Sequence, residues 1–152
     1  MKTQHNPQQL DLSMQLSEHF QLHEFVRSGT AITRGIDNTP PREAVALLQA
    51  LCENVLEPLR RRFGVIRITS GYRCEELNKA VKGAVHSQHL YGEAADIHIS
   101  SREEGQRMAD FLLNEGICFD QAIIEYDRAT SARWLHLSYR PLRCRRQVIG
   151  NK

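Results

Sequence analysis

The segment 87-SQHLYGEAAD-96 places a histidine, a carboxylate and several small residues in one short stretch, and the tripeptide 134-WLH-136 adds a second histidine later in the chain. Imidazole nitrogens and carboxylate oxygens are common ligands of Zn²⁺ in proteins. His89, Asp96 and His136 supply three such ligands, and a site with three protein ligands keeps one position for water. The sequence therefore predicts one zinc ion in a catalytic type of site, and a small hydrolase.

Alternating apolar and polar residues predict strands over residues 94–99 and 133–139. Because alternate side chains of a strand share a face, Asp96 and His136 would point away from the apolar neighbours on their own strands. His89 would reach the same place from the preceding loop. The three ligands meet only if the two strands are neighbours in the sheet, and the spacing leaves that open.

Three residues next to the proposed ligands have supporting assignments. His98 shares a face with Asp96 and would compete as a ligand, but a place at the rim of the site is favoured. Ser87 is expected to orient His89 or to cap its loop. Trp134 is expected to form a wall of the cleft.

Helices are expected first along the chain and strands later. Apolar residues at three- and four-residue steps predict helices over 16–27 and 42–63, and Pro58 is expected to kink the second or to split off its last turn. The further elements expected are helices at about 76–81 and 101–116, a strand over 65–69, and strands 120–126 and 133–139 joined as a hairpin. This order is typical of an α+β fold, with N-terminal helices packed on a small, mostly antiparallel sheet.

The four cysteines, Cys52, Cys74, Cys118 and Cys144, are widely spaced and form no CxxC pair. The first twenty residues lack the apolar core of a signal peptide, so synthesis in the cytoplasm is expected. Reduced, buried cysteines are therefore predicted. Cys144 lies among arginines that would lower its pKa, but no catalytic base accompanies it in the sequence.

These motifs resemble those of the zinc D-alanyl-D-alanine carboxypeptidases and related peptidoglycan peptidases with the Hedgehog/DD-peptidase fold, in particular their small single-domain branch. The family motif S-x-H-x-x-G-x-A-x-D matches 87–96, and its W-x-H matches 134–136. The tetrapeptide 70-SGYR-73 with Asn78 is similar to the family's S-G-Y-R…N segment. The likeness covers about residues 16–140.

The resemblance implies a zinc ion held by His89, Asp96 and His136, and a peptide substrate from the cell wall. It also places Arg73 near the substrate, with Tyr72 beside it. Several family members carry an acidic residue or a second histidine just before the last ligand. Here those positions are arginine and tryptophan, so the catalytic base must come from elsewhere.

Glu125 is the candidate base. If the hairpin pairs Tyr126 with Arg133, then Glu125 faces Trp134 and is a diagonal neighbour of His136 on the same face. A register shifted by one residue would turn Glu125 to the other face.

Glu93 and Asp127 are weaker alternatives for the base. In the expected mechanism, Glu125 takes a proton from the attacking water and gives it to the leaving amine. Arg73 would bind the terminal carboxylate of the substrate or stabilise the developing oxyanion.

We divide the chain of 152 residues into a flexible N-terminal segment (1–15), a zinc peptidase domain (16–142) and a basic C-terminal tail (143–152). The net charge of +2 is too small to indicate a nucleic-acid or membrane partner. No apolar run approaches membrane-spanning length. The oligomeric state is left open.

Two classes of function remain. The first is a metallopeptidase that acts on peptidoglycan stem peptides, either as a D,D-carboxypeptidase or as an endolysin-type endopeptidase. The second is a non-catalytic, zinc-stabilised module that binds cell-wall peptide or protein, and a fourth ligand such as His98 would favour it. A phage or prophage lysis enzyme released to the cell wall is slightly favoured over a housekeeping role.

Overall fold

The structure is a computed structural model that describes residues 9–150. The helical elements are α1 (His23–Val26), α2 (Gly29–Arg34), α3 (Arg42–Leu51), the π-helical turn η1 (Cys52–Leu56), α4 (Glu57–Phe63), α5 (Glu75–Ala80), the 3₁₀ turn η2 (Gln88–Tyr91) and α6 (Arg102–Asn114). The strands are β1 (Ile68–Ser70), β2 (Ala94–His98), β3 (Gln121–Tyr126), β4 (Arg133–Ser138) and β5 (Gln147–Gly150). The α+β fold class predicted from the sequence is confirmed.

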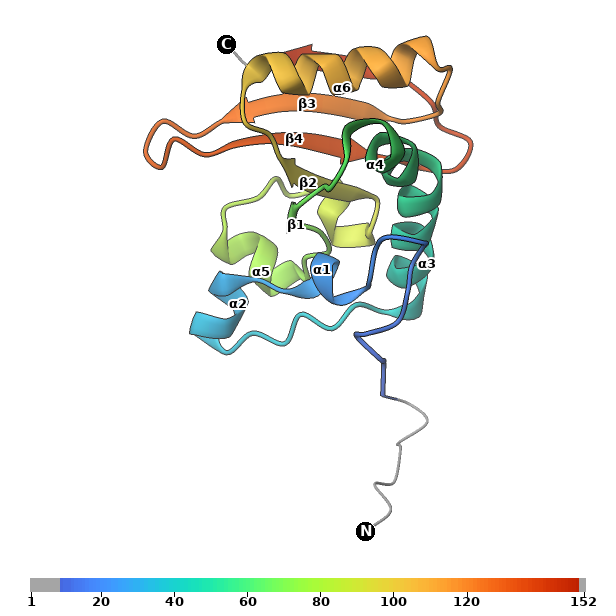
Figure 1. The fold of residues 1–152 in the computed structure, drawn as a ribbon. Helices are drawn as coiled ribbons and strands as arrows, with labels where there is room; N and C mark the ends of the chain where they lie inside the picture. Colours follow the sequence, from blue (N-terminus) through green and yellow to red (C-terminus); the bar gives the residue numbers. More distant parts are fainter. Residues whose placement is uncertain (1–8, 151–152) are drawn as a thin grey trace.

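The described strands form one sheet in the order β1-β2-β4-β3-β5, in which all neighbours are antiparallel except β3 and β5 (Figure 1). Helix α6 packs along β3 and β4. Helix α1 contacts β1, the strand at the other edge of the sheet. Alternate residues of the central strands, including Ile97, Ile124 and Leu135, are buried in the apolar core under the helices. The intervening residues point to the other face, where polar side chains gather.

The predicted helix over 16–27 is wrong in its first half. Only His23–Val26 is helical, and the preceding residues form a turn closed by a bridge between Gln15 and Gln21. Helix α2 was not expected from the sequence. Its N-terminus is capped by Ser28, whose hydroxyl accepts a hydrogen bond from the third residue of the helix.

The predicted helix over 42–63 is helical throughout, and it is divided into α3, η1 and α4. The π-helical turn η1 shifts the hydrogen-bond pattern ahead of Pro58. Pro58 then lies in the first turn of α4, where its missing N–H is not needed. The long amphipathic helix and an interruption at Pro58 were therefore predicted correctly, and the π-helical turn was not predicted.

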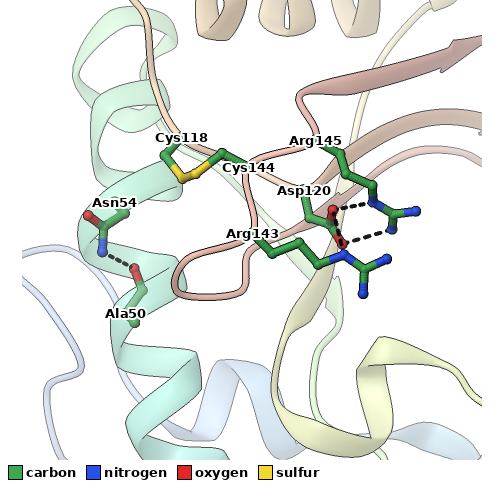
Figure 2. The surroundings of a disulfide bond; sticks show 7 residues. All are labelled: Ala50, Asn54, Cys118, Asp120, Arg143, Cys144 and Arg145. Atoms are coloured by element: carbon green, nitrogen blue, oxygen red, sulfur yellow. Dashed lines mark hydrogen bonds and ion pairs between the residues drawn. A yellow bond between two sulfur atoms is a disulfide. The ribbon is translucent and has the colours of Figure 1, made fainter.

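The segment 143–152, set apart as a basic tail, contains strand β5, which pairs with β3. Cys118 and Cys144 form a disulfide that ties this segment to the end of α6 (Figure 2). The prediction of four reduced cysteines is therefore wrong for this pair. Cys52 and Cys74 are free, and Cys52 is buried in the core as expected.

Part of the segment predicted to be flexible, residues 1–8, lies outside the described residues. Met14, near its end, packs against the core. Among residues 9–150, none of the helices combines the length and the apolar character needed to cross a bilayer.

Candidate metal centre

The pairing of β2 with β4 brings two of the predicted ligands together. Asp96 lies directly opposite His136 in the antiparallel register, so both side chains project from the same face of the sheet. His89 comes from the 3₁₀ turn η2. Gly92 ends this turn with φ +78°, and a Cβ atom there would lie 2.4 Å from the backbone oxygen of Ala44. Only glycine fits this reversal of the chain.

The three side chains form a close cluster. Nε2 of His89 lies 3.3 Å, and Nδ1 of His136 2.9 Å, from Oδ1 of Asp96. One ligand atom from each residue lies within 4.8 Å of the other two. His89 and Asp96 are buried, and His136 is partly exposed.

The backbone fixes the orientation of His89. Its Nδ1 donates a 2.7 Å hydrogen bond to the carbonyl oxygen of Gly71, which leaves the Nε2 lone pair for a ligand. Gly71 lies so close to helix α1 that a Cβ atom would stand 2.5 Å from the oxygen of Phe25. Ser87 caps the η2 turn, since its hydroxyl accepts a hydrogen bond from the N–H of His89.

Arg73 points into the same cluster. Its Nε donates to the hydroxyl of Ser70 at 3.2 Å, and its Nη1 donates to Oδ1 of Asn78 at 3.3 Å. Nη2 of Arg73 lies 3.6 Å from Oδ2 of Asp96. The two neutral side chains therefore hold the guanidinium group beside the predicted ligands.

Charge and burial compete at this site. Burial disfavours the ionised form of Asp96, but the imidazoles of His89 and His136 outweigh it and hold the pKa of Asp96 well below its ordinary value. Burial lowers the pKa of Arg73, against the opposing effect of the carboxylates of Asp96 and Glu125. Asp96 is therefore an anionic ligand at neutral pH.

The cluster opens into a cavity of about 370 Å³. Glu125 and Trp134 form part of its wall, together with Arg73 and the three predicted ligands. The hairpin has the register that the assignment of Glu125 required, with Tyr126 opposite Arg133 and Glu125 opposite Trp134. Burial and the nearby charge of Asp96 raise the pKa of Glu125 above the ordinary value.

The other predicted site residues lie outside this cavity. His98 is exposed and stands opposite Trp134 in the sheet. Tyr72 is buried and borders a different cavity, next to α2. Glu93 lines a neighbouring cavity, and Asp127 accepts hydrogen bonds within the β3–β4 loop. Of the carboxylates considered as the base, Glu125 is the one on the wall of the metal cavity.

The sequence reasoning missed three polar residues of the cavity wall: His86, Gln88 and Gln121. His86 was treated as an ordinary polar residue because it belongs to no ligand pattern. Gln88 lies inside the 87–96 motif, but at a position where the motif accepts any residue. Gln121 is the first residue of β3, on the same face as Glu125, so the strand alternation was the signal that pointed to it.

A second group of possible ligands, Glu18, His19 and Glu57, is also close together. The buried carboxylate of Glu57, however, already accepts hydrogen bonds from the Ser17 hydroxyl and from the backbone N–H of His19, and it is 2.7 Å from the imidazole Nδ1 of His19. These contacts join the N-terminal turn to α4. The group is therefore a structural clasp.

The donor set of the main cluster fits zinc. Two imidazole nitrogens and one carboxylate oxygen are a ligand set of catalytic zinc sites, and the tautomer of His89 is fixed in the form that a metal needs. The cavity gives water and substrate access to the cluster. Fold and site together define a metal-dependent hydrolase of the α+β class.

Comparison with protein-family models identifies the family. The model described as Peptidase M15 matches residues 18–138, which include the predicted ligands, Arg73 and Glu125. The chain therefore belongs to the Peptidase M15 family and is a metallopeptidase; enzymes of this family depend on zinc. A comparison with curated proteins found no match.

Proposed function

We propose that the protein hydrolyses peptide bonds in the stem peptides of peptidoglycan, as a D,D-carboxypeptidase or as an endolysin-type endopeptidase. One observation carries the proposal: three zinc-type ligands, a carboxylate and a guanidinium group surround a single open cavity. The resemblance of the 87–96 and 134–136 motifs to cell-wall peptidases supports the choice of substrate.

In the proposed mechanism, His89, Asp96 and His136 hold one zinc ion. Bound zinc lowers the pKa of a water molecule and polarises a carbonyl group. Glu125 accepts the proton of the attacking water and then donates it to the leaving amine. In the metal-free protein, partial burial and the charge of Asp96 raise the pKa of Glu125, so its carboxylate has an increased affinity for a proton.

Arg73 supplies positive charge at the reacting end of the cavity. Ser70 and Asn78 hold its guanidinium group, so little side-chain entropy is lost when a substrate binds. In a carboxypeptidase, Arg73 binds the terminal carboxylate; in an endopeptidase, it stabilises the oxyanion that forms at the scissile carbonyl.

A side chain in the fourth ligand position would favour a non-catalytic zinc module. Among residues 9–150, the ligand cluster contains His89, Asp96 and His136 without a fourth member, and His98 is exposed outside the cavity. The enzyme is therefore the better-supported alternative.

We also propose that the protein acts at the cell wall after leaving the cytoplasm, as a phage or prophage lysis enzyme would. The Cys118–Cys144 disulfide supports this, because disulfides persist in oxidising surroundings.

The test is to incubate zinc-loaded protein with purified peptidoglycan fragments and to identify the products by mass spectrometry. Free D-alanine would identify a carboxypeptidase, and a divided stem peptide an endopeptidase. The variant Glu125→Gln should bind zinc and lose activity by ~10²–10⁴-fold. The control Glu103→Gln changes an exposed carboxylate on α6 and should retain full activity. Absence of any product from the wild-type protein, or equal product from Glu125→Gln, would reject the proposal.

A further inference from the structure

A second, larger cavity of about 590 Å³ lies beside the metal cavity. The two cavities share His86, Gln88 and Gln121 as lining residues. A ligand that extends from the metal centre past these side chains would therefore enter the second cavity, which has no role in the mechanism described above.

Three arginines from one short segment line the second cavity. The side chains of Arg140, Arg143 and Arg145 are 56%, 48% and 41% exposed, so each guanidinium group can reach a ligand. Among the described residues, Glu93 is the one carboxylate on the cavity wall, and the nearby Asp120 is buried. Three positive charges thus face two negative charges.

The arginines differ in how firmly they are paired. Arg145 forms hydrogen bonds with both carboxylate oxygens of Asp120 and is committed to the fold (Figure 2). Nε of Arg143 lies 3.9 Å from Asp120, and Nε of Arg140 lies 3.8 Å from Glu93. At these separations, no direct hydrogen bond forms. Arg140 and Arg143 therefore keep donors for a ligand.

The segment that carries these arginines is anchored at several points. Cys144, which lies between Arg143 and Arg145 in the sequence, forms a disulfide with Cys118. Asp120, two residues after Cys118, accepts hydrogen bonds from Arg145 (Figure 2). Strand β5 follows directly and pairs with β3. The backbone that carries Arg140 and Arg143 is therefore positioned before any ligand binds, which lowers the entropic cost of binding.

We propose that this cavity binds a free carboxylate of the peptide substrate, on a residue remote from the scissile bond, through Arg140 and Arg143. The planar guanidinium group matches a carboxylate with paired hydrogen bonds. The negative charge of Glu93 on the same wall favours a peptide, which carries N–H donors beside its carboxylate, over a simple anion. The proposal rests on the proposed peptidase function and specifies its substrate.

The experiment compares two synthetic stem peptides that differ only in their internal carboxylates, which are free in one and converted to amides in the other. The double variant Arg140→Gln/Arg143→Gln is measured against the wild-type protein and against the exposed control Arg61→Gln on α4. We expect KM for the free-carboxylate peptide to rise about tenfold in the double variant, as for two half-exposed ion pairs. Its kcat should remain within about twofold, and KM for the amidated peptide should not change.

Equal changes in KM for the two peptides, or no change for either, would overturn the proposal. The single variant Arg140→Gln alters the most exposed of the three side chains and should show the same selective effect at about threefold if the double variant fails to fold.

Calorimetric binding of both peptides to metal-free protein separates this proposal from the peptidase function. Tighter binding of the free-carboxylate peptide, lost in the double variant, would support the cavity even if the wild-type protein cleaves neither peptide. If inorganic phosphate, or a phosphate-rich wall polymer, displaces the free-carboxylate peptide as well as the unlabelled peptide itself does, the cavity is a general anion site and the proposed peptide site is rejected.

Discussion

Removal of the Cys118–Cys144 disulfide tests the C-terminal architecture independently of function. The disulfide closes a loop with a sequence separation of 26 residues. The chain-entropy relation gives about 3.5 kcal/mol of stabilisation for a loop of this length at 25 °C. Neither cysteine belongs to the buried core, so the double variant Cys118→Ser/Cys144→Ser should lose little packing.

We therefore expect the free energy of unfolding of the double variant to be about 3.5 kcal/mol lower than that of the oxidised wild-type protein. For a chain of this size, each kcal/mol changes Tm by about 2–4 °C, so Tm should fall by about 7–14 °C. Urea and thermal unfolding followed by circular dichroism measure both quantities. Dithiothreitol should bring the wild-type protein to the midpoint of the variant and should leave the variant unchanged.

A thiol titration of the denatured, unreduced wild-type protein provides the control. Two reactive thiols are expected, from Cys52 and Cys74. Four reactive thiols, or unfolding midpoints that do not respond to dithiothreitol, would refute the reasoning.

Three further predictions concern the metal centre and the N-terminal clasp. Zinc at about 100 times its Kd should stabilise the wild-type protein by about 2.7 kcal/mol, and Asp96→Asn should remove this effect in thermal unfolding with and without zinc; equal stabilisation of both would contradict the ligand assignment. Arg73→Gln should lower kcat/KM for peptide cleavage by ~10²–10³-fold with zinc still bound, as steady-state kinetics would show, and unchanged kinetics would exclude a role for Arg73. Burial raises the pKa of Glu57, but hydrogen bonds from Ser17 and His19 outweigh it, and the pKa is lowered overall. The ionised Glu57 therefore stabilises the folded protein fully above about pH 4.5, and this stabilisation is lost as the pH falls through the lowered pKa. Glu57→Gln should therefore cost about 1–3 kcal/mol at neutral pH and reduce the loss of stability in acid, measured by urea unfolding over a pH series; a parallel pH dependence in both proteins would refute this.

The elements that the sequence predicted well are those with local signals. The alternation in 120–126 and 133–139 predicted both strands and, because a short loop joins them, their pairing as a hairpin, whereas the register was only a condition that the structure meets. The apolar spacing in 42–63 predicted the long helix. The spacing in 16–27 has the same form, but residues 16–22 form a turn. Hydrogen bonds to distant residues stabilise this turn, including the bond from Ser17 to Glu57. Tertiary contacts overrode the local pattern there.

The second cavity could not be predicted from the sequence. It depends on the pairing of Cys118 with Cys144, and spacing alone does not determine a disulfide partner. It also depends on Asp120, which accepts hydrogen bonds from Arg145. In the sequence, Arg145 belongs to a run of arginines with the composition of a solvated tail. Each of these contacts joins residues more than twenty positions apart. Their partners become known only when the fold is known.

The position of the base follows from the central place of β4 in the sheet. Pairing with β2 places Asp96 opposite His136, and pairing with β3 places Glu125 opposite Trp134. Two predicted ligands, Asp96 and His136, and the proposed base Glu125 are thus placed by two separate strand pairings on the two edges of one strand. A carboxylate on β4 itself, ahead of the last ligand, is not needed. The residue at that point, Arg133, instead lies over the ring of Tyr126, 4.4 Å from its centroid, next to Glu125 in the hairpin. This cation–π contact joins the two strands at the end of the hairpin and favours the register that keeps Glu125, the proposed base, on the same face as the predicted ligands.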